Sequence, residues 1–130
     1  MNIWTNGCFD IVHIGHIELF KFAKSLGNNL IVGIDSDDRV RSLKGISRPI
    51  NTENNRKQFL ESIRYIDRVV VFDTEEELRN YIQKLQIQTI VVGSDYINRT
   101  VIGSEYAKVQ IFNRIPDIST TSILRSIAAG

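Results

Sequence analysis

The stretch Thr5–His16, with the sequence TNGCFDIVHIGH, connects a short apolar run to the start of an amphipathic segment. The run Asn2–Thr5 is typical of a buried strand, and the apolar side chains of His16–Leu26 recur at helical spacing. Gly7 allows a close turn above the strand end. The N–H groups at a helix start attract anions, and imidazoles add hydrogen-bond donors. The stretch therefore predicts a strand–turn–helix unit that binds a polyphosphate at its turn.

Short runs rich in Ile and Val alternate with amphipathic segments along the rest of the chain. The runs are nearly continuous, which is typical of strands buried on both faces of a parallel sheet. The expected strands are Asn2–Thr5, Leu30–Ile34, Arg68–Phe72, Thr89–Val92 and Val109–Phe112, and the expected helices are His16–Leu26, Glu53–Tyr65, Glu75–Leu85 and about Thr120–Ala128. The pattern predicts a three-layer α/β domain, with a Rossmann-like, doubly wound parallel sheet of about five strands. Ligands of such sheets bind at the carboxyl ends of the strands.

The composition indicates an ordinary soluble protein with one domain, residues 1–130. Hydrophobic residues make up 42% and charged residues 24%, and the net charge of +1 gives no general attraction to nucleic acid. The apolar runs are too short to cross a bilayer, and the single cysteine excludes an internal disulfide. We therefore expect a cytoplasmic protein that binds neither nucleic acid nor membrane.

The two histidines, His13 and His16, lie three residues apart at the expected helix start. A zinc site needs three or four ligands, so with one cysteine in the chain it would also need carboxylates. Capping or surface histidines are the plain alternative, but the position after the Gly7 turn favours an anion-binding role. Cys8 has no base beside it in the sequence, so we interpret it as structural, with its backbone N–H toward phosphate. Asp10 orients the loop or caps the helix in this interpretation, and does not act as a base.

A basic segment follows the second expected strand. Lys44 and Arg48 lie in the loop KGISRPIN, and Arg56 and Arg64 lie about two turns apart on the next expected helix, so they can face broadly one side. Two phosphorylated reactants need a cationic wall of this kind, for which arginine is well suited. A solvated charged face is the alternative.

Two further polar segments come late in the chain. Gly93 ends the fourth expected strand, where Asp95 can accept from a base amine and Tyr96 can form an aromatic wall; a simple turn is the alternative. The run Ser119–Thr121 places three hydroxyl residues at the start of the last expected helix. Such a start forms an anion cradle, although a simple N-cap needs only one of the three.

Taken in order, these four segments resemble the motifs of cytidylyltransferase-like nucleotidyltransferases over essentially the whole chain. TNGCFDIVHIGH is similar to the family signature (T/N)GxFDxxHxGH, and residues 114–121 are similar to RTEGISTT, except at residues 115–117. The resemblance implies that His13 and His16, helped by Lys44 and Arg114, stabilise charge at the α-phosphorus. It implies nucleotide binding by Asn6, Gly7, Cys8, Phe9, Gly15, Gly93, Asp95, Tyr96, Ser119, Thr120 and Thr121, and acceptor or phosphate binding by Asp10, Arg48, Arg56 and Arg64. Mg²⁺ would be held through the triphosphate, with no ligands from side chains.

The family implies transfer of a nucleoside monophosphate from ATP or CTP to a phosphorylated sugar or polyol, with release of pyrophosphate. KGISRPIN and the segment GSDY, followed by GSE, are similar to the nucleotidyltransferase domain of ADP-heptose synthase, although Val92 stands where lysine is usual there. The run RYID at Arg64–Asp67 and the complete ISTT resemble glycerol-3-phosphate cytidylyltransferase instead. We favour the heptose 1-phosphate type and keep the glycerol type as the alternative. A nucleotide-binding module without catalysis is a more remote alternative. Family members are commonly homodimers, and we expect one here.

Overall fold

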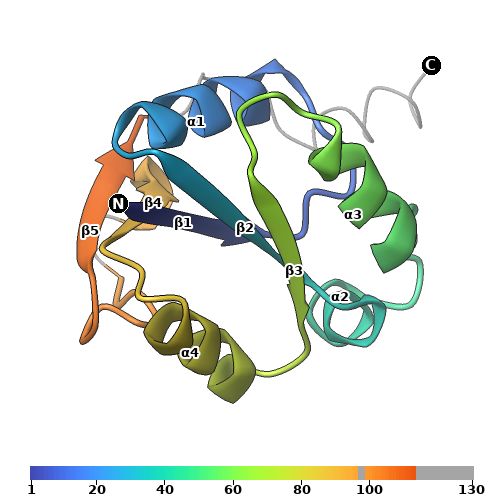
Figure 1. The fold of residues 1–130 in the computed structure, drawn as a ribbon. Helices are drawn as coiled ribbons and strands as arrows, with labels where there is room; N and C mark the ends of the chain where they lie inside the picture. Colours follow the sequence, from blue (N-terminus) through green and yellow to red (C-terminus); the bar gives the residue numbers. More distant parts are fainter. Residues whose placement is uncertain (97–98, 114–130) are drawn as a thin grey trace.

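The structure is a computed structural model that describes residues 1–96 and 99–113 (Figure 1). Within these ranges it contains a parallel sheet of five strands in the order β3-β2-β1-β4-β5. The strands are β1 Asn2–Gly7, β2 Asn29–Asp35, β3 Arg68–Phe72, β4 Thr89–Gly93 and β5 Lys108–Phe112. The helices are α1 Ile14–Ser25, α2 Asp37–Lys44, α3 Glu53–Glu61 and α4 Glu75–Lys84, with the short 3₁₀ helix η1 at Ser94–Tyr96.

The helices cover both faces of the sheet. Phe20 of α1 and Leu60 of α3 pack with Leu30 and Val32 on one face, whereas Ile82 of α4 packs on the other face with the following residues: Trp4, Ile31, Phe72 and Ile90. Figure 1 shows this arrangement, with α1 and α3 on the opposite side of the sheet from α4. Removing each such side chain from water is worth about 1.5–3 kcal/mol. The three-layer, doubly wound fold predicted from the sequence is confirmed.

The sequence located the strands better than the helices. Each predicted strand is present and shifted by two residues or fewer at its ends. The helix Glu53–Tyr65 was predicted too long, because α3 ends at Glu61 and Ser62 is its C-cap. Helix α2 was not predicted, since its sequence DDRVRSLK has no apolar stripe and buries only Val40. The predicted helix Thr120–Ala128 lies outside the described residues.

The direction of winding changes between β1 and β4. The crossover from β1 to β2 runs over the face that carries α1, and the crossover from β3 to β4 runs over the face that carries α4. The two connections therefore leave β1 and β4 toward opposite faces of the sheet. A crevice forms between them above the carboxyl ends of these strands. In the described part of the chain, no helix is both long and apolar enough to cross a membrane.

Candidate active site at the carboxyl ends of the strands

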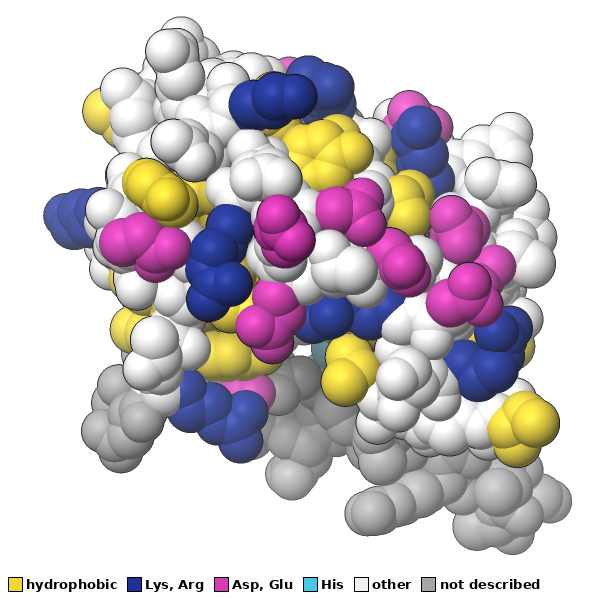
Figure 2. Space-filling model, turned by 90° about the horizontal axis from the view of Figure 1, so that it is seen from below, with side chains coloured by type: hydrophobic (Ala, Val, Ile, Leu, Met, Phe, Trp, Pro, Cys, Tyr) yellow, Lys and Arg dark blue, Asp and Glu magenta, His cyan; other side chains and the backbone are white. Residues whose placement is uncertain are grey.

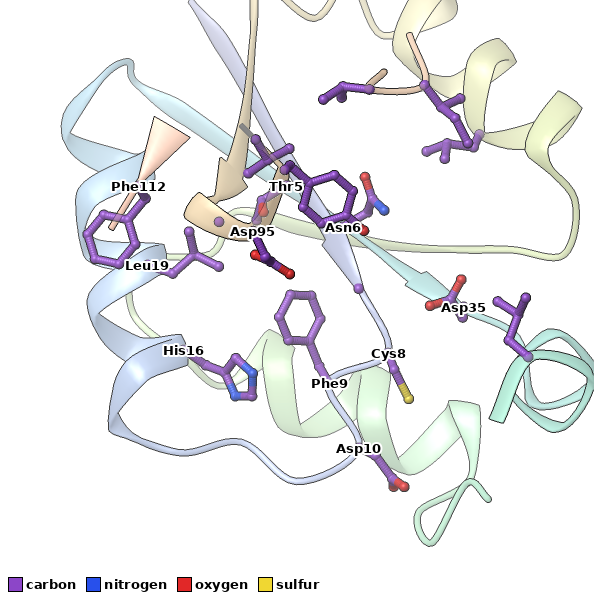
Figure 3. A pocket seen from close by; sticks show the side chains of 18 of the residues that line it. Thr5, Asn6, Cys8, Phe9, Asp10, His16, Leu19, Asp35, Asp95 and Phe112 are labelled. Atoms are coloured by element: carbon purple, nitrogen blue, oxygen red, sulfur yellow. The ribbon is translucent and has the colours of Figure 1, made fainter. Parts of the chain in front are cut away.

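A cleft of about 630 Å³ opens at this edge of the sheet. Figure 3 shows that its walls come from the segment after β1, from α1, from the end of β2 and from η1. The predicted site residues that line it are Asn6, Gly7, Cys8, Phe9, Asp10, His13, Gly15, His16, Lys44, Arg48, Gly93, Asp95 and Tyr96. Arg114, Ser119, Thr120 and Thr121 lie outside the described residues, so their predicted roles stay predictions.

The two histidines cap the first turn of α1 reciprocally. His13 is the N-cap residue, and its Nδ1 accepts a hydrogen bond of 3.1 Å from the Gly15 N–H. His16 Nδ1 accepts a hydrogen bond of 3.2 Å from the His13 N–H. The two rings stack with their centroids 3.9 Å apart. The cap therefore fixes both rings at the wall of the cleft.

These hydrogen bonds also assign the tautomer of each ring. A nitrogen that accepts a hydrogen bond carries no proton, so the proton of each neutral imidazole lies on Nε2. His13 and His16 thus each have an Nε2–H donor. A neutral donor of this kind can bind a phosphate oxygen, whereas a proton on Nδ1 would break the cap.

The residues around the histidines hold their rings in place. A Cβ atom on Gly15 would lie only 2.9 Å from Cε1 of His13, so any side chain at that position would displace the His13 ring. Phe9 has a φ of 49°, in the left-handed region, and turns its ring inward against His16 and Phe20, with centroid separations of 5.2 and 5.1 Å. A Cβ atom on Gly7 would approach Phe9 Cζ to 3.1 Å, which explains the glycine before the turn. The sequence did not predict this supporting role of the Phe9 ring.

Asp10 anchors the basic loop. Its carboxylate accepts hydrogen bonds from the N–H groups of Ile50 and Asn51, at 2.8 and 2.7 Å, and from Arg48 Nε at 3.0 Å. Burial acts to raise the pKa of Asp10, but these hydrogen bonds and the Arg48 charge hold that pKa below its usual value. The structure therefore supports the orienting role of Asp10. The predicted contact of Asp10 with the acceptor has no support in the structure, because both carboxylate oxygens accept hydrogen bonds from the basic loop.

Arg48 reaches the cleft from this anchored loop. Its Nε pairs with Asp10, and the Arg48 side chain lines the cleft. Within residues 1–96 and 99–113, the buried Nη2 of Arg48 has no hydrogen-bond partner. A buried donor without a partner is costly, and an anionic ligand would satisfy it.

Arg56 has a structural role. Its side chain is 2% exposed and donates to the backbone carbonyls of Asn51, Cys8 and Asp35, at 3.0, 3.0 and 2.7 Å. Its Nη2 donates to Asp37 at 2.8 Å. Arg56 therefore ties the ends of β1 and β2 to α3, and it does not line the cleft.

Arg64 lies beyond the end of α3, and its guanidinium is exposed and sits 5.3 Å from the centre of the Tyr65 ring. It does not line the cleft either. The prediction that Arg56 and Arg64 form one cationic wall is therefore wrong. Arg64 does not share a helical face with Arg56, because α3 ends at Glu61. The Arg56 guanidinium is directed away from the cleft, because it binds the backbone carbonyls named above.

The thiol of Cys8 is poorly suited to act as a nucleophile. Burial raises its pKa, although the positive charges of Lys44 and Arg56 oppose this effect. The Cys8 carbonyl accepts from Arg56, which fixes the backbone of the turn. Both observations support the structural role predicted for this residue.

A further wall of the cleft is formed by the end of β4 and by η1. Gly93 ends β4 as predicted, and Asp95 and Tyr96 follow in η1. Figure 3 shows the Asp95 carboxylate on the same side of the cleft as His16. On the floor, Asn6 Oδ1 accepts from Trp4 Nε1 at 2.9 Å, so the Asn6 amide nitrogen remains as a donor. These groups can bind a nucleotide by hydrogen bonding.

The sequence missed the wall at the end of β2. Asp35, Arg39 and Leu43 line the cleft there, and the last two belong to the unpredicted helix α2. The only signal was a polar residue, Asp35, directly after the apolar run Leu30–Ile34. Among the described residues, no group of three or more His, Cys, Asp or Glu side chains is placed to hold a metal ion. Figure 2 shows acidic and basic side chains interspersed over the face seen from below.

The cytidylyltransferase-like family model matches residues 4–126, which confirms the resemblance drawn from the motifs. The bifunctional protein HldE of Helicobacter hepaticus (strain ATCC 51449 / 3B1) is 45% identical over 128 residues, which cover 96% of this chain and 26% of that protein. The protein of the same name from Campylobacter fetus subsp. fetus (strain 82-40) is 40% identical over 126 residues, covering 96% of this chain and 27% of that protein. The chain thus spans about a quarter of the length of these relatives.

Solved structures agree with the fold. A lipopolysaccharide core biosynthesis protein from Thermoplasma volcanium GSS1 superimposes with a TM-score of 0.70 at 25% identity, covering 88% of this chain and 96% of that one. Pantothenate synthetase from Thermus thermophilus gives a TM-score of 0.59 at 10% identity, covering 95% of this chain and 64% of that one. The second likeness concerns the fold alone.

Proposed function

The chain belongs to the cytidylyltransferase-like family of nucleotidyltransferases, and we propose that it transfers a nucleoside monophosphate from a nucleoside triphosphate to a phosphorylated sugar. The observation that carries the proposal is the reciprocal cap of His13 and His16 at the switch point of the sheet. The cap places two imidazoles and the N-terminus of α1 at the wall of the cleft. That combination suits a polyphosphate whose charge grows during reaction.

The reaction needs no general base, because a phosphate monoester is already anionic near neutral pH. An oxygen of the acceptor phosphate attacks the α-phosphorus in line with the bond to the β-phosphate. The new P–O bond forms as the old one breaks, and pyrophosphate leaves with the electron pair. Catalysis then consists of positioning and charge stabilisation. The Nε2–H groups of His13 and His16 and the ammonium of Lys44 would stabilise charge on the α-phosphate.

The remaining roles follow from the positions of the side chains and from the family motifs. The backbone of Asn6–Phe9, together with Gly15, would receive the triphosphate, and Gly93, Asp95 and Tyr96 would hold the nucleoside. Arg114 would help to stabilise charge on the α-phosphate, and the run Ser119–Thr121 would bind the β- and γ-phosphates, with Mg²⁺ bound by phosphate oxygens. Arg48, whose buried Nη2 has no hydrogen-bond partner among the described residues, would bind phosphate in the cleft. We also propose that the protein acts as a homodimer in the cytoplasm.

The preferred acceptor is heptose 1-phosphate, with ATP as the donor. Two HldE proteins share 40% and 45% identity with almost the whole chain, and the motifs resemble the nucleotidyltransferase domain of ADP-heptose synthase. Two segments favoured glycerol 3-phosphate and CTP, the run Arg64–Asp67 and the run Ile118–Thr121, and the second lies outside the described residues. Arg64 lies outside the cleft, so it cannot contact an acceptor bound there. The resemblance of its segment therefore does not favour glycerol 3-phosphate.

The test is pyrophosphate release by the purified protein with Mg²⁺. ATP and CTP are each combined with heptose 1-phosphate, other sugar 1-phosphates and glycerol 3-phosphate. Release with ATP and heptose 1-phosphate supports the proposal. Release only with CTP and glycerol 3-phosphate keeps the reaction class and overturns the substrate assignment. Nucleotide binding without release from any pair would favour a non-catalytic module.

A further inference from the structure

A pair of side chains with opposite charges lines the cleft at the end of β2. Asp35 is the last residue of β2, and Arg39 lies in the first turn of α2; Arg39 Nε donates to Asp35 Oδ1 at 2.7 Å. Their side chains are only 14% and 18% exposed. The guanidinium also lies 5.3 Å from the centre of the Phe72 ring, which supports one of its faces. Both side chains are therefore held in one orientation.

The pair retains hydrogen-bonding capacity toward the cleft. Within the described part of the chain, no hydrogen bond reaches Asp35 Oδ2 or the two terminal nitrogens of Arg39. One acceptor atom and two donor groups are therefore available side by side. Partly buried polar groups gain most from a ligand that satisfies them.

The charge of the pair selects the kind of ligand group. The Asp35–Arg39 pair is neutral overall. The Asp35 carboxylate would repel a phosphate group placed next to the pair. A hydroxyl group both donates and accepts, so neighbouring hydroxyls can donate to Asp35 and accept from Arg39. Lys44 also lines the cleft and has no ion-pair partner among residues 1–96 and 99–113, so a phosphate is better placed beside it and Arg48.

The position of the pair separates it from the nucleoside wall. Figure 3 shows Asp35 across the cleft from Leu19 and Phe112, with Asn6 and Phe9 between. Asp95 lies on the side of Phe112, so the two walls flank the segment that follows β1. A ligand whose phosphate reaches the histidines can extend toward β2 without crossing the nucleoside.

We propose that Asp35 and Arg39 bind hydroxyl groups of the acceptor and select a polyhydroxylated phosphate over a simple phosphate ester. This inference rests on the proposed function and adds the residues that determine specificity. Arg39 would contact the acceptor and not the nucleotide. Replacing Arg39 should therefore weaken acceptor binding and leave nucleotide binding and turnover near wild type.

The experiment compares wild type with Arg39→Gln in pyrophosphate release. The acceptor is the sugar 1-phosphate that the wild type uses best, and ethyl phosphate, which lacks the hydroxyls, serves as a competitive inhibitor. Arg39→Gln should raise KM for the sugar 1-phosphate about tenfold, as expected for the loss of hydrogen bonds to a charged group. The kcat value, KM for ATP and the inhibition constant of ethyl phosphate should stay within about twofold.

Arg41→Gln is the matched control, because Arg41 is an exposed arginine of the same helix that pairs with Asp38 and does not line the cleft. It should behave like wild type. Arg39→Lys, which keeps the charge and loses the planar fork, provides a second variant if Arg39→Gln does not fold, and should also raise KM for the sugar 1-phosphate.

An unchanged KM for the sugar 1-phosphate, or an equal weakening of ethyl phosphate, would overturn this inference and leave the proposed function standing. Failure of the wild type to release pyrophosphate with any acceptor would overturn both.

Discussion

Replacing Gly15 with alanine should separate catalysis from stability. The new Cβ atom would lie 2.9 Å from Cε1 and 3.0 Å from Nδ1 of His13, where ordinary contact begins at 3.4 Å. The His13 ring must therefore move by at least about 0.5 Å, and its hydrogen bond from the Gly15 N–H is lost or distorted. His16 shifts as well, because its ring stacks on His13.

The two effects on stability nearly cancel. Alanine is favoured over glycine within a helix by about 1 kcal/mol, and loss of an N-cap costs about 1 kcal/mol. We therefore expect the free energy of unfolding of Gly15→Ala to stay within about 1 kcal/mol of wild type. Loss of one donor to the transition state costs about 10²–10³ in kcat. Turnover should fall by that factor.

The assay combines pyrophosphate release, which gives kcat and KM, with urea unfolding. Ile14→Ala is the control, since Ile14 is the preceding residue of α1, is 52% exposed and does not line the cleft. The control should keep near-wild-type turnover. A Gly15→Ala variant with kcat within about threefold of wild type would show that catalysis does not depend on glycine at this position.

Two further predictions concern the residues that hold the cleft together. The pKa of Asp10 is lowered in the folded state, so its contribution to stability is complete above about pH 4 and is lost as the pH falls through that lowered pKa. Urea unfolding between pH 2.5 and 7 should show that the free energy of unfolding of the wild type falls at low pH, and that it falls less in Asp10→Asn. Parallel pH profiles of the two proteins would contradict this role of Asp10. Arg56→Lys should lower the free energy of unfolding by about 3 kcal/mol, because lysine cannot reach the three carbonyls and Asp37 together. Urea unfolding of this variant would argue against the structural role of Arg56 if the loss stayed below about 1 kcal/mol.

The strands were predictable because local pattern determines them. Strands β2, β3 and β4 are runs rich in Ile and Val with buried side chains, whereas β1 buries Ile3 and Trp4 and the residues of β5 are only partly buried or exposed. Helix α2 has no such pattern, and what stabilises it is local capping by Ser36, whose Oγ accepts from the Arg39 N–H at 3.1 Å. Its existence therefore could not be read from apolar periodicity.

The candidate site divides in the same way. His13, His16 and Gly15 were predictable because the helix start and the switch point place them together. The role of Arg56 was not, because it depends on carbonyls of Cys8 and Asp35, which are 48 and 21 residues away in the chain. Tertiary contacts of this kind leave no periodic signal in the sequence.

The variant His16→Asn shows whether the His16 imidazole stabilises charge on the triphosphate. The asparagine oxygen can replace Nδ1 as the acceptor for the His13 N–H, so the cap is kept while the Nε2–H donor is removed. In this variant kcat for pyrophosphate release should fall by about 10²–10³, while the free energy of unfolding stays within about 1 kcal/mol of wild type. Near-wild-type turnover by a folded His16→Asn protein would contradict this role of His16.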